Sequence, residues 1–223
     1  LLGQATARYV DALYVAGENL LGEHAMTRLD AEANRVRPGL TDEPAWPTLR
    51  AHLVLLGAHG IDPVASLTVA AASRELDTAD DVAAVLDWRL DESGLRNAGV
   101  GPLPWIPAVP PALAADVTWG PYLAARTQLV TTLAEQVADR ACSSPIQPTW
   151  VDTGAAAPPP QLVAAVEVWR AAVGVDPADT RPTGAPALGK AAATYQRQLR
   201  AGLTAPRTPA DQEWSSTLAR IAP

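Results

Sequence analysis

Apolar residues recur at helical spacing along most of the chain. The first stretch places one set of apolar and small residues on a single helix face: Val10, Leu13, Gly17, Leu20 and Leu21. Glycine and proline end such runs, and polar caps followed by proline begin new ones. The pattern predicts helices over 6–36 (one long helix or two in series), 44–59, 62–76, 78–90, 119–141, 161–173, 186–202 and 209–221.

The helix over 62–76 begins with Asp62-Pro63, an N-cap residue followed by proline, and two further helices carry recognisable start signals. Thr41 or Asp42 can cap the helix over 44–59, and Pro44 would then lie in its first turn. Thr78 is followed three residues later by Asp81, a spacing close to that of a capping box. These signals support one helix that starts near residue 44 and another that starts near residue 78.

The pattern as a whole indicates an all-α fold. No segment alternates with period two for long enough to be a convincing strand, and the flanks of "HLVLLGAH" (52–59) favour a helix over a short buried strand. We predict a multi-helix bundle with a proline-rich strap. Its organisation would be a helical domain over 1–142, a proline-rich linker over 143–160, and a smaller helical subdomain over 161–223 packed on the first.

Composition adds how these helices should pack. Hydrophobic residues make up 48% of the chain, much of this is alanine, phenylalanine is absent, and there are seven tryptophans. We expect close packing through small residues, with the tryptophans as core anchors, one per element. The sixteen arginines against one lysine indicate a high-GC genome rather than a binding device.

Charge and cysteine content restrict the function classes. The net charge is −7, so the chain as a whole is no polyanion binder, although the charge is uneven: −8 over 1–92 and +1 over 93–223. Cys142 is the single cysteine, which fits a reducing, cytoplasmic location. We expect no membrane insertion, because no apolar run approaches ~18–20 residues. The start has neither a methionine nor a basic signal region, so we expect a piece of a longer protein.

No motif predicts a catalytic, metal or cofactor site. His52 and His59 are seven positions apart, which separates them by ~10 Å along a helix, too far for one metal. The acidic residues over 75–92 lack the pattern of a calcium loop, and most are better explained as helix-start residues. "GAPALGKAAA" (184–193) has the wrong glycine spacing for a phosphate loop.

A weak nucleic-acid signal lies near the end of the chain. Between Asp179 and Asp211 there is no acidic residue, and five basic residues form a candidate basic stripe: Arg181, Lys190, Arg197, Arg200 and Arg207. Such a stripe could hold phosphates. Because it is short, a solvated helix face is the favoured interpretation.

The segment "GPLPWIPAVPP" (101–111) has two interpretations. Its prolines fix an extended backbone, which suits a ligand for an aromatic-lined groove; the contact residues would be Pro102, Pro104, Trp105 and Pro107. The same stiffness suits a strap across the helices, with Trp105 and Ile106 inserted in the core. We favour the strap, because the chain is poor in aromatic residues.

Several stretches together resemble the C-terminal region of F-type conjugative relaxase–helicases, in the forms encoded by actinobacterial plasmids and integrative elements. The resemblance covers most of the chain in the same order, through "TARYVDALYVAGENLLG" (6–22), "PAWPTLRAHLVLLGAHGIDPVASL" (44–67), "RELDTADDVAAVLDWRL" (74–90), "GPLPWIPAVPPALAADVTWGPYLAAR" (101–126) and "VEVWRAAVGVDPADTRPTGAPAL" (166–188).

The resemblance implies a non-catalytic tail of a larger enzyme. Members of that family nick DNA through a tyrosine beside a three-histidine metal site and unwind it with an ATP-driven motor, and this chain has the motifs of neither part. We therefore expect a protein-interaction module that contacts the coupling protein or other parts of the transfer machinery. The alternative is an auxiliary single-stranded DNA-binding module that uses residues 181–207, and an independent enzyme is a third hypothesis without a visible site.

Overall fold

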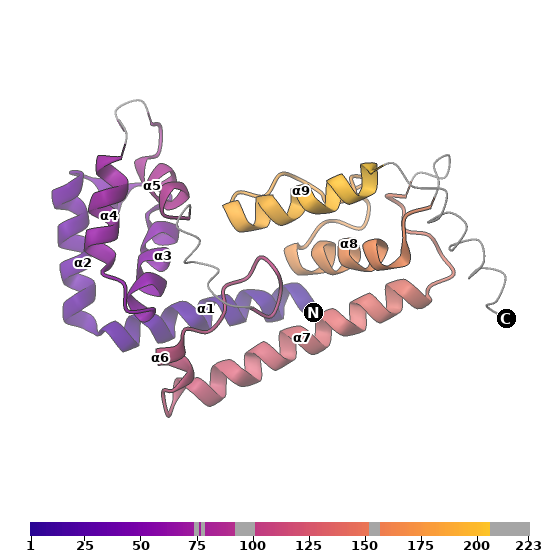
Figure 1. The fold of residues 1–223 in the computed structure, drawn as a ribbon, viewed down its shortest axis with the longest axis horizontal. Helices are drawn as coiled ribbons and strands as arrows, with labels where there is room; N and C mark the ends of the chain where they lie inside the picture. Colours follow the sequence, from indigo (N-terminus) through magenta and orange to yellow (C-terminus); the bar gives the residue numbers. More distant parts are fainter. Residues whose placement is uncertain (74–75, 77–78, 92–100, 152–156, 206–223) are drawn as a thin grey trace. The chain divides into compact units, whose positions relative to one another are not determined.

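The computed structural model describes residues 1–73, 76, 79–91, 101–151 and 157–205 of the chain (Figure 1). These residues form helices and connecting loops, and none of them lies in a strand, so the predicted all-α fold is confirmed for this part of the chain. The elements are α1 (Leu2–Leu21), α2 (Glu23–Val36), the 3₁₀ turn η1 (Leu40–Asp42), α3 (Trp46–Ala58), α4 (Pro63–Ala72), α5 (Val82–Asp91), α6 (Pro111–Ala114), α7 (Trp119–Ser143), α8 (Pro160–Val173) and α9 (Lys190–Thr204).

Each predicted helix that lies within the described residues has a counterpart among these elements, whereas η1 and α6 were not predicted. The uncertain first run is resolved. Residues 6–36 form two helices in series, which Gly22 separates with a φ of 82° that a side chain would disfavour. Asp62 caps α4 as an N-cap followed by proline, and its carboxylate accepts the amides of Val64 and Ala65. The helix predicted over 209–221 lies outside the described residues.

The start of α3 differs from the prediction. Neither Thr41 nor Asp42 caps it, because residues 40–42 form η1 and the helix begins only at Trp46. The backbone amide of Ala45 is instead held by Asp81, whose Oδ2 accepts it at 2.9 Å. The other oxygen of Asp81 accepts the amide of Ala84 at 2.9 Å at the start of α5, so one carboxylate serves two helix starts. Thr78, the other half of the predicted capping box, is outside the described residues.

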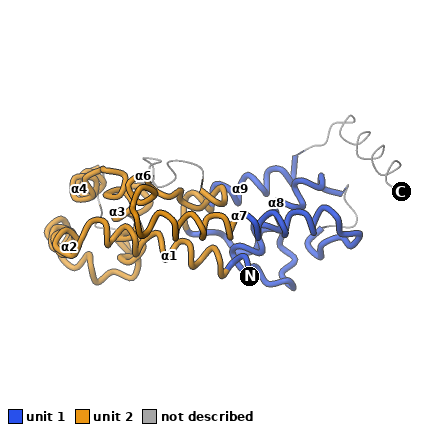
Figure 2. The backbone as a smooth tube through the Cα atoms, turned by 90° about the horizontal axis from the view of Figure 1, so that it is seen from below, with its two compact units in different colours: residues 1–3, 132–188, 193–223 blue, residues 4–131, 189–192 orange. Residues whose placement is uncertain are grey.

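The chain divides into two compact units (Figure 2). Unit 1 comprises residues 1–3, 132–188 and 193–223, and unit 2 comprises residues 4–131 and 189–192. The sequence-based division at a linker over 143–160, with a packed subdomain after it, stays a prediction.

Unit 2 has a helical core built around α3. This helix is buried on nearly all sides, and the predicted stripe of Leu49, Leu53 and Leu56 is fully buried in it. Helices α4 and α5 pack against α3, and α2 packs against α4. The core that they share contains Met26, Leu29, Ala33, Leu67, Ala70, Val82, Ala83, Leu86 and Leu90. Burial of this apolar surface is the main stabilising contribution to the unit.

Small residues let α1 approach α3 closely. A Cβ placed on Gly17 would lie 2.5 Å from Cγ1 of Val54, and one placed on Gly57 would lie 2.9 Å from the δ carbons of Leu21. Each helix thus offers a glycine where the other offers a branched side chain. The expected packing through small residues is present at this pair of helices.

Unit 1 is centred on α8. Val166 and Trp169 are buried on one face of this helix. The centre of the Trp169 ring lies 6.0 Å from the centre of the Tyr195 ring in α9. A Cβ on Gly202 would meet the δ carbons of Leu162 at 3.3 Å, so α9 also packs closely on α8.

Most of the tryptophans are core anchors, as predicted, but not all. Trp46, Trp105, Trp150 and Trp169 are buried. Trp88 is 51% exposed and Trp119 is half-buried, while Trp214 lies outside the described residues.

None of the described helices combines the length and the apolar character needed to cross a membrane.

Candidate functional site

The proline-rich strap is anchored within unit 2. Leu103, Trp105 and Pro107 are buried, whereas Pro104 is exposed and Pro102 is partly exposed. The turn at the start of the strap is tight, because a Cβ on Gly101 would lie only 2.0 Å from a backbone oxygen. These contacts favour the brace over the recognition ligand, since Trp105 and Pro107 are already covered by the chain itself.

A buried tyrosine fixes the strap. Tyr9 of α1 is fully buried, and its hydroxyl donates a hydrogen bond of 2.7 Å to the carbonyl oxygen of Pro107. Burial raises the pKa of Tyr9 to about 12, and a hydrogen bond with the Thr127 hydroxyl offsets only part of that rise. The phenol therefore stays neutral over the physiological range and acts as a structural donor, not as an acid or a nucleophile.

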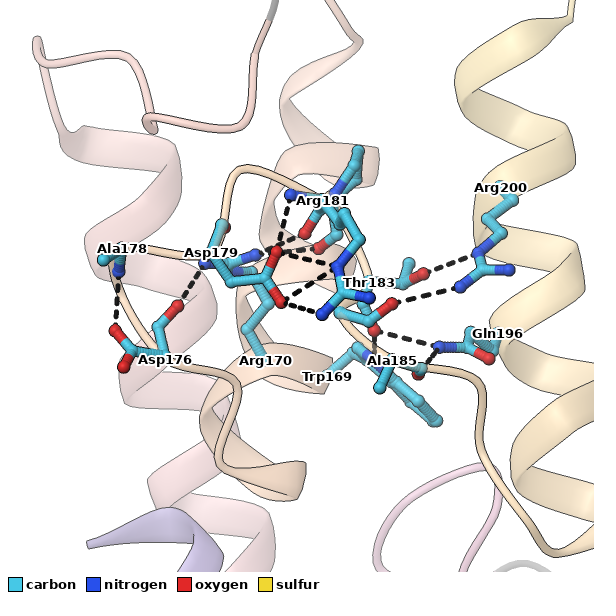
Figure 3. Close-up of polar contacts among 12 residues, drawn as sticks. Trp169, Arg170, Asp176, Ala178, Asp179, Arg181, Thr183, Ala185, Gln196 and Arg200 are labelled. Carbon is cyan, nitrogen blue, oxygen red and sulfur yellow. Dashed lines mark hydrogen bonds and ion pairs between the residues drawn. The ribbon is translucent and has the colours of Figure 1, made fainter.

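Two residues of the candidate basic stripe are engaged in folding unit 1 (Figure 3). Arg181 forms a bidentate pair with Asp179, and hydrogen bonds from Arg181 lower the pKa of that carboxyl to about 2. Arg200 donates to the Thr183 hydroxyl at 2.8 Å and to the Gly184 carbonyl at 3.2 Å. Both guanidinium groups are therefore partly committed to the loop between α8 and α9.

The other three residues of the stripe have different surroundings. The ammonium group of Lys190 lies 5.5 Å from the ring centre of Trp88, in a cation–π geometry. Arg197 is exposed and donates to the hydroxyl of Thr194 at 3.1 Å. Arg207 lies outside the described residues. Of the four described residues, Arg197 is thus the one whose contacts leave most of its cation available to a phosphate.

The residue that organises unit 1 is Arg170, which the sequence analysis did not single out. Its side chain is buried, and its two terminal nitrogens donate to four backbone carbonyls at 2.7–3.2 Å (Figure 3). The acceptors belong to Asp176, Asp179, Arg181 and Pro182. An arginine can serve four acceptors because its donors lie in a fixed plane. Its role here is to fold a loop.

Neighbouring side chains complete that loop. The indole nitrogen of Trp169 donates to the Thr183 carbonyl at 3.0 Å, and Gln196 of α9 donates to the same carbonyl at 2.9 Å. Gln196 also donates to the carbonyl of Ala185 and accepts the amide of Ala187. The side-chain amide of Gln196 is buried, and all of these hydrogen bonds are made within the chain. The cluster therefore has a structural role.

The histidines and acidic residues do not assemble a metal site in the described part of the chain. No group of three potential ligands is found there. His52 is fully buried and its Nδ1 lies 3.0 Å from Oδ1 of Asp87, a pair within the core of unit 2. Burial lowers the pKa of His59. Glu75, Asp77 and Glu92 of the acidic stretch are outside the described residues.

A concave feature of unit 2 that fits a binding site is a groove between α1 and α7. Its volume is about 550 Å³. The lining consists of Arg8, Asp11, Ala12 and Val15 from α1 and Thr118, Trp119, Tyr122 and Arg126 from α7. Most of the lining surface is apolar, and Val15 and Tyr122 are 49% and 43% exposed. We call this feature the α1–α7 groove.

The start of α7 positions the groove's aromatic residues. Oδ1 of Asp116 accepts the amides of Thr118 and Trp119 at 2.8 and 2.7 Å, and these bonds lower the pKa of the carboxyl. A Cβ on Gly120 would lie 2.4 Å from the Ala114 carbonyl oxygen, so glycine permits the sharp entry from α6 into α7. The cap and the glycine together fix where Trp119 emerges.

The aromatic and cationic groups of α7 contact one another in sequence along one face of the helix. The rings of Trp119 and Tyr122 meet edge to face with centres 6.0 Å apart, and the guanidinium of Arg126 lies 4.9 Å from the centre of the Tyr122 ring. Sequence reasoning missed this groove. The spacing of Trp119, Tyr122 and Arg126 at i, i+3 and i+7 is the signal that could have placed them on one face of a helix.

Comparisons with protein-family models, curated proteins and solved structures find no match for this chain.

Proposed function

We propose that this chain is a non-catalytic interaction module that docks onto another protein through the α1–α7 groove. The observation that carries the proposal is the groove itself, an apolar concavity whose Val15 and Tyr122 are about half exposed. Exposed apolar surface gathered in a concavity is typical of recognition sites. The sequence resemblance supports conjugative DNA transfer as the process, with the coupling protein as the foremost partner.

Charge supports a protein partner over DNA. The chain carries a net charge of −7, which opposes approach to a polyanion. Within the basic stripe, Arg181 is neutralised by Asp179, and Arg200 is bonded to the Thr183 hydroxyl and the Gly184 carbonyl. The described part of the stripe therefore leaves little positive charge available to phosphates.

The test is binding of the purified chain to the purified coupling protein of the same genetic element, measured by isothermal titration calorimetry. Val15→Gln is expected to weaken binding by about tenfold, because a buried valine contributes about 1.5 kcal/mol. Val69→Gln is the matched control, since Val69 is an exposed valine of α4 in the same unit and does not line the groove. Absence of binding by the unmodified chain, or an equal effect of the two variants, would contradict the proposal.

Single-stranded DNA binding by residues 181–207 remains the second candidate, and Arg197 is the observation that favours it. This arginine is exposed on α9, and the charge of its guanidinium is not matched by a carboxylate among the described residues. Labelled oligo(dT) would be titrated with the chain across a salt series. Binding that falls steeply with salt and is lost in Lys190→Ala/Arg197→Ala would favour this function; no binding at low salt would reject it.

A further inference from the structure

We propose that the α1–α7 groove binds an amphipathic helical segment whose apolar face is flanked by carboxylates. This inference rests on the proposed docking function and names the chemistry of the partner. It depends on three features of the groove: its apolar floor, the two arginines that line it, and the face of the Tyr122 ring that Arg126 covers.

The floor is shaped for apolar side chains on a helix. Ala12 and Val15 lie one turn apart on α1, and Trp119 and Tyr122 lie one turn apart on α7. Small residues on one wall and large ones on the other leave a groove of about 550 Å³, within the ~300–1,000 Å³ typical of binding pockets. A groove between two helices with apolar residues at one-turn spacing is the geometry in which an amphipathic helix is recognised.

Two arginines lie in the groove, one from each helix. Arg8 belongs to α1 and Arg126 to α7, and no carboxylate forms an ion pair with either of them among the described residues. Two other arginines of unit 2 are paired, Arg35 with Glu32 and Arg50 with Glu18 and Asp30. In an acid-rich chain, unmatched cations at an apolar groove indicate a ligand that brings its own carboxylates.

The aromatic rings argue against a nucleic acid in this groove. Stacking of a base needs an open ring face. One face of Tyr122 is covered by Arg126, and the ring packs edge to face with Trp119. Asp11 adds a negative charge to the lining, which opposes a continuous phosphate backbone but tolerates separate carboxylates. The groove therefore favours an acidic peptide.

The test is selection from a helix-biased random peptide library displayed on phage, with the full chain as the target. We expect the selected peptides to carry large apolar residues at one-turn spacing with an excess of Glu and Asp beside them. A synthetic copy of the best peptide should bind Arg8→Glu and Arg126→Glu about tenfold more weakly, and its affinity should fall with salt. Arg28→Glu is the matched control, because Arg28 is an exposed arginine of α2 outside the groove.

Several outcomes would overturn the proposal: no enriched peptide, enriched peptides without an acidic excess, equal binding to the groove variants and to Arg28→Glu, or displacement of the peptide by oligo(dT). Arg126→Gln, which keeps the packing over Tyr122, covers the case in which charge reversal disturbs folding. If Val15→Gln weakens coupling-protein binding while both charge reversals leave it unchanged, the docking function stands and the acidic occupant is rejected.

Discussion

The hydroxyl of Tyr9 donates a 2.7 Å hydrogen bond to the carbonyl oxygen of Pro107, 98 positions further along the chain. A proline has no amide hydrogen, so its backbone can take part in hydrogen bonds only through the carbonyl oxygen. At Pro107 a side chain from α1 donates to that oxygen. The bond is buried, and it joins the first helix to the segment whose purpose the sequence left open between a ligand and a brace.

Replacing this tyrosine tests the brace. Tyr9→Phe should lower the free energy of unfolding by about 1–2 kcal/mol, because the buried carbonyl of Pro107 loses its donor while the ring packing is kept. Urea denaturation followed by circular dichroism would measure the change. Tyr14→Phe in the same helix is the control and should have a smaller effect. Equal effects would show that the bond to the strap contributes nothing.

The same residue predicts the shape of the alkaline stability profile. The pKa of Tyr9 is about 12 in the folded chain against 10 in the unfolded chain, so the folded state holds the proton more tightly. Its contribution is complete below pH 10 and is lost as the pH rises through 12. Tyr9→Phe should therefore lose less stability than the unmodified chain between pH 10 and 12, measured by urea denaturation in that interval. Parallel profiles would contradict the buried, neutral phenol.

The helices were predictable because their signals are local. The apolar period, the Asp62-Pro63 start and the glycine stops depend on residues a few positions apart. The start of α3 was not, because its amide at Ala45 is held by Asp81, 36 positions away. Thr41, the predicted cap, instead receives the side-chain amide of Asn34 on its hydroxyl.

The site residues were harder to predict because they also depend on contacts between residues far apart in the sequence. A run of cations is visible in sequence, but the acceptors that occupy Arg200 come from a loop 16 and 17 positions earlier. Arg170 looks like an ordinary helix-surface arginine until the loop folds over it. The α1–α7 groove needs two helices more than a hundred positions apart, and only the Trp119–Tyr122–Arg126 spacing was available in the sequence.

A third prediction concerns the close approach of α1 and α3. Gly17→Ala should destabilise unit 2 by about 1–3 kcal/mol, although alanine usually favours a helix, because its Cβ would lie 2.5 Å from Cγ1 of Val54 and valine is stiff at χ1. Adding Val54→Ala should recover part of the loss. Thermal and urea unfolding of both single variants and the double variant would give the coupling energy. Strictly additive losses would contradict the contact.

A fourth prediction concerns the folding role of Arg170. Arg170→Lys should destabilise unit 1 by about 3 kcal/mol or more, because an ammonium group has three donors and cannot serve the four carbonyls to which the guanidinium donates. The rate of amide hydrogen exchange over residues 174–189 should also rise in this variant. Arg181→Lys is the control: Arg181 is 62% exposed, and the variant should stay within about 0.5 kcal/mol of the unmodified chain. Comparable losses in both variants would contradict the special role of Arg170.

The last prediction concerns the buried pair of His52 and Asp87. Since a carboxylate accepts at Nδ1, that nitrogen carries the proton, and Nε2 has no hydrogen-bond partner among the described residues. Asp87→Ala should cost about 2–4 kcal/mol, because it leaves a fully buried imidazole with both nitrogens unsatisfied. His52→Leu should cost less, because the Asp87 carboxylate is 14% exposed and can be hydrated.

The double variant His52→Leu/Asp87→Ala separates the hydrogen bond of the imidazole from its packing. Removing the imidazole from the Asp87→Ala background should restore part of the lost stability, since an unsatisfied polar group is replaced by an apolar one in an apolar core. Urea unfolding of the four proteins closes the cycle. A double variant that is less stable than Asp87→Ala would mean that the packing of the imidazole, and not its hydrogen bond to the carboxylate, is what the core of unit 2 requires.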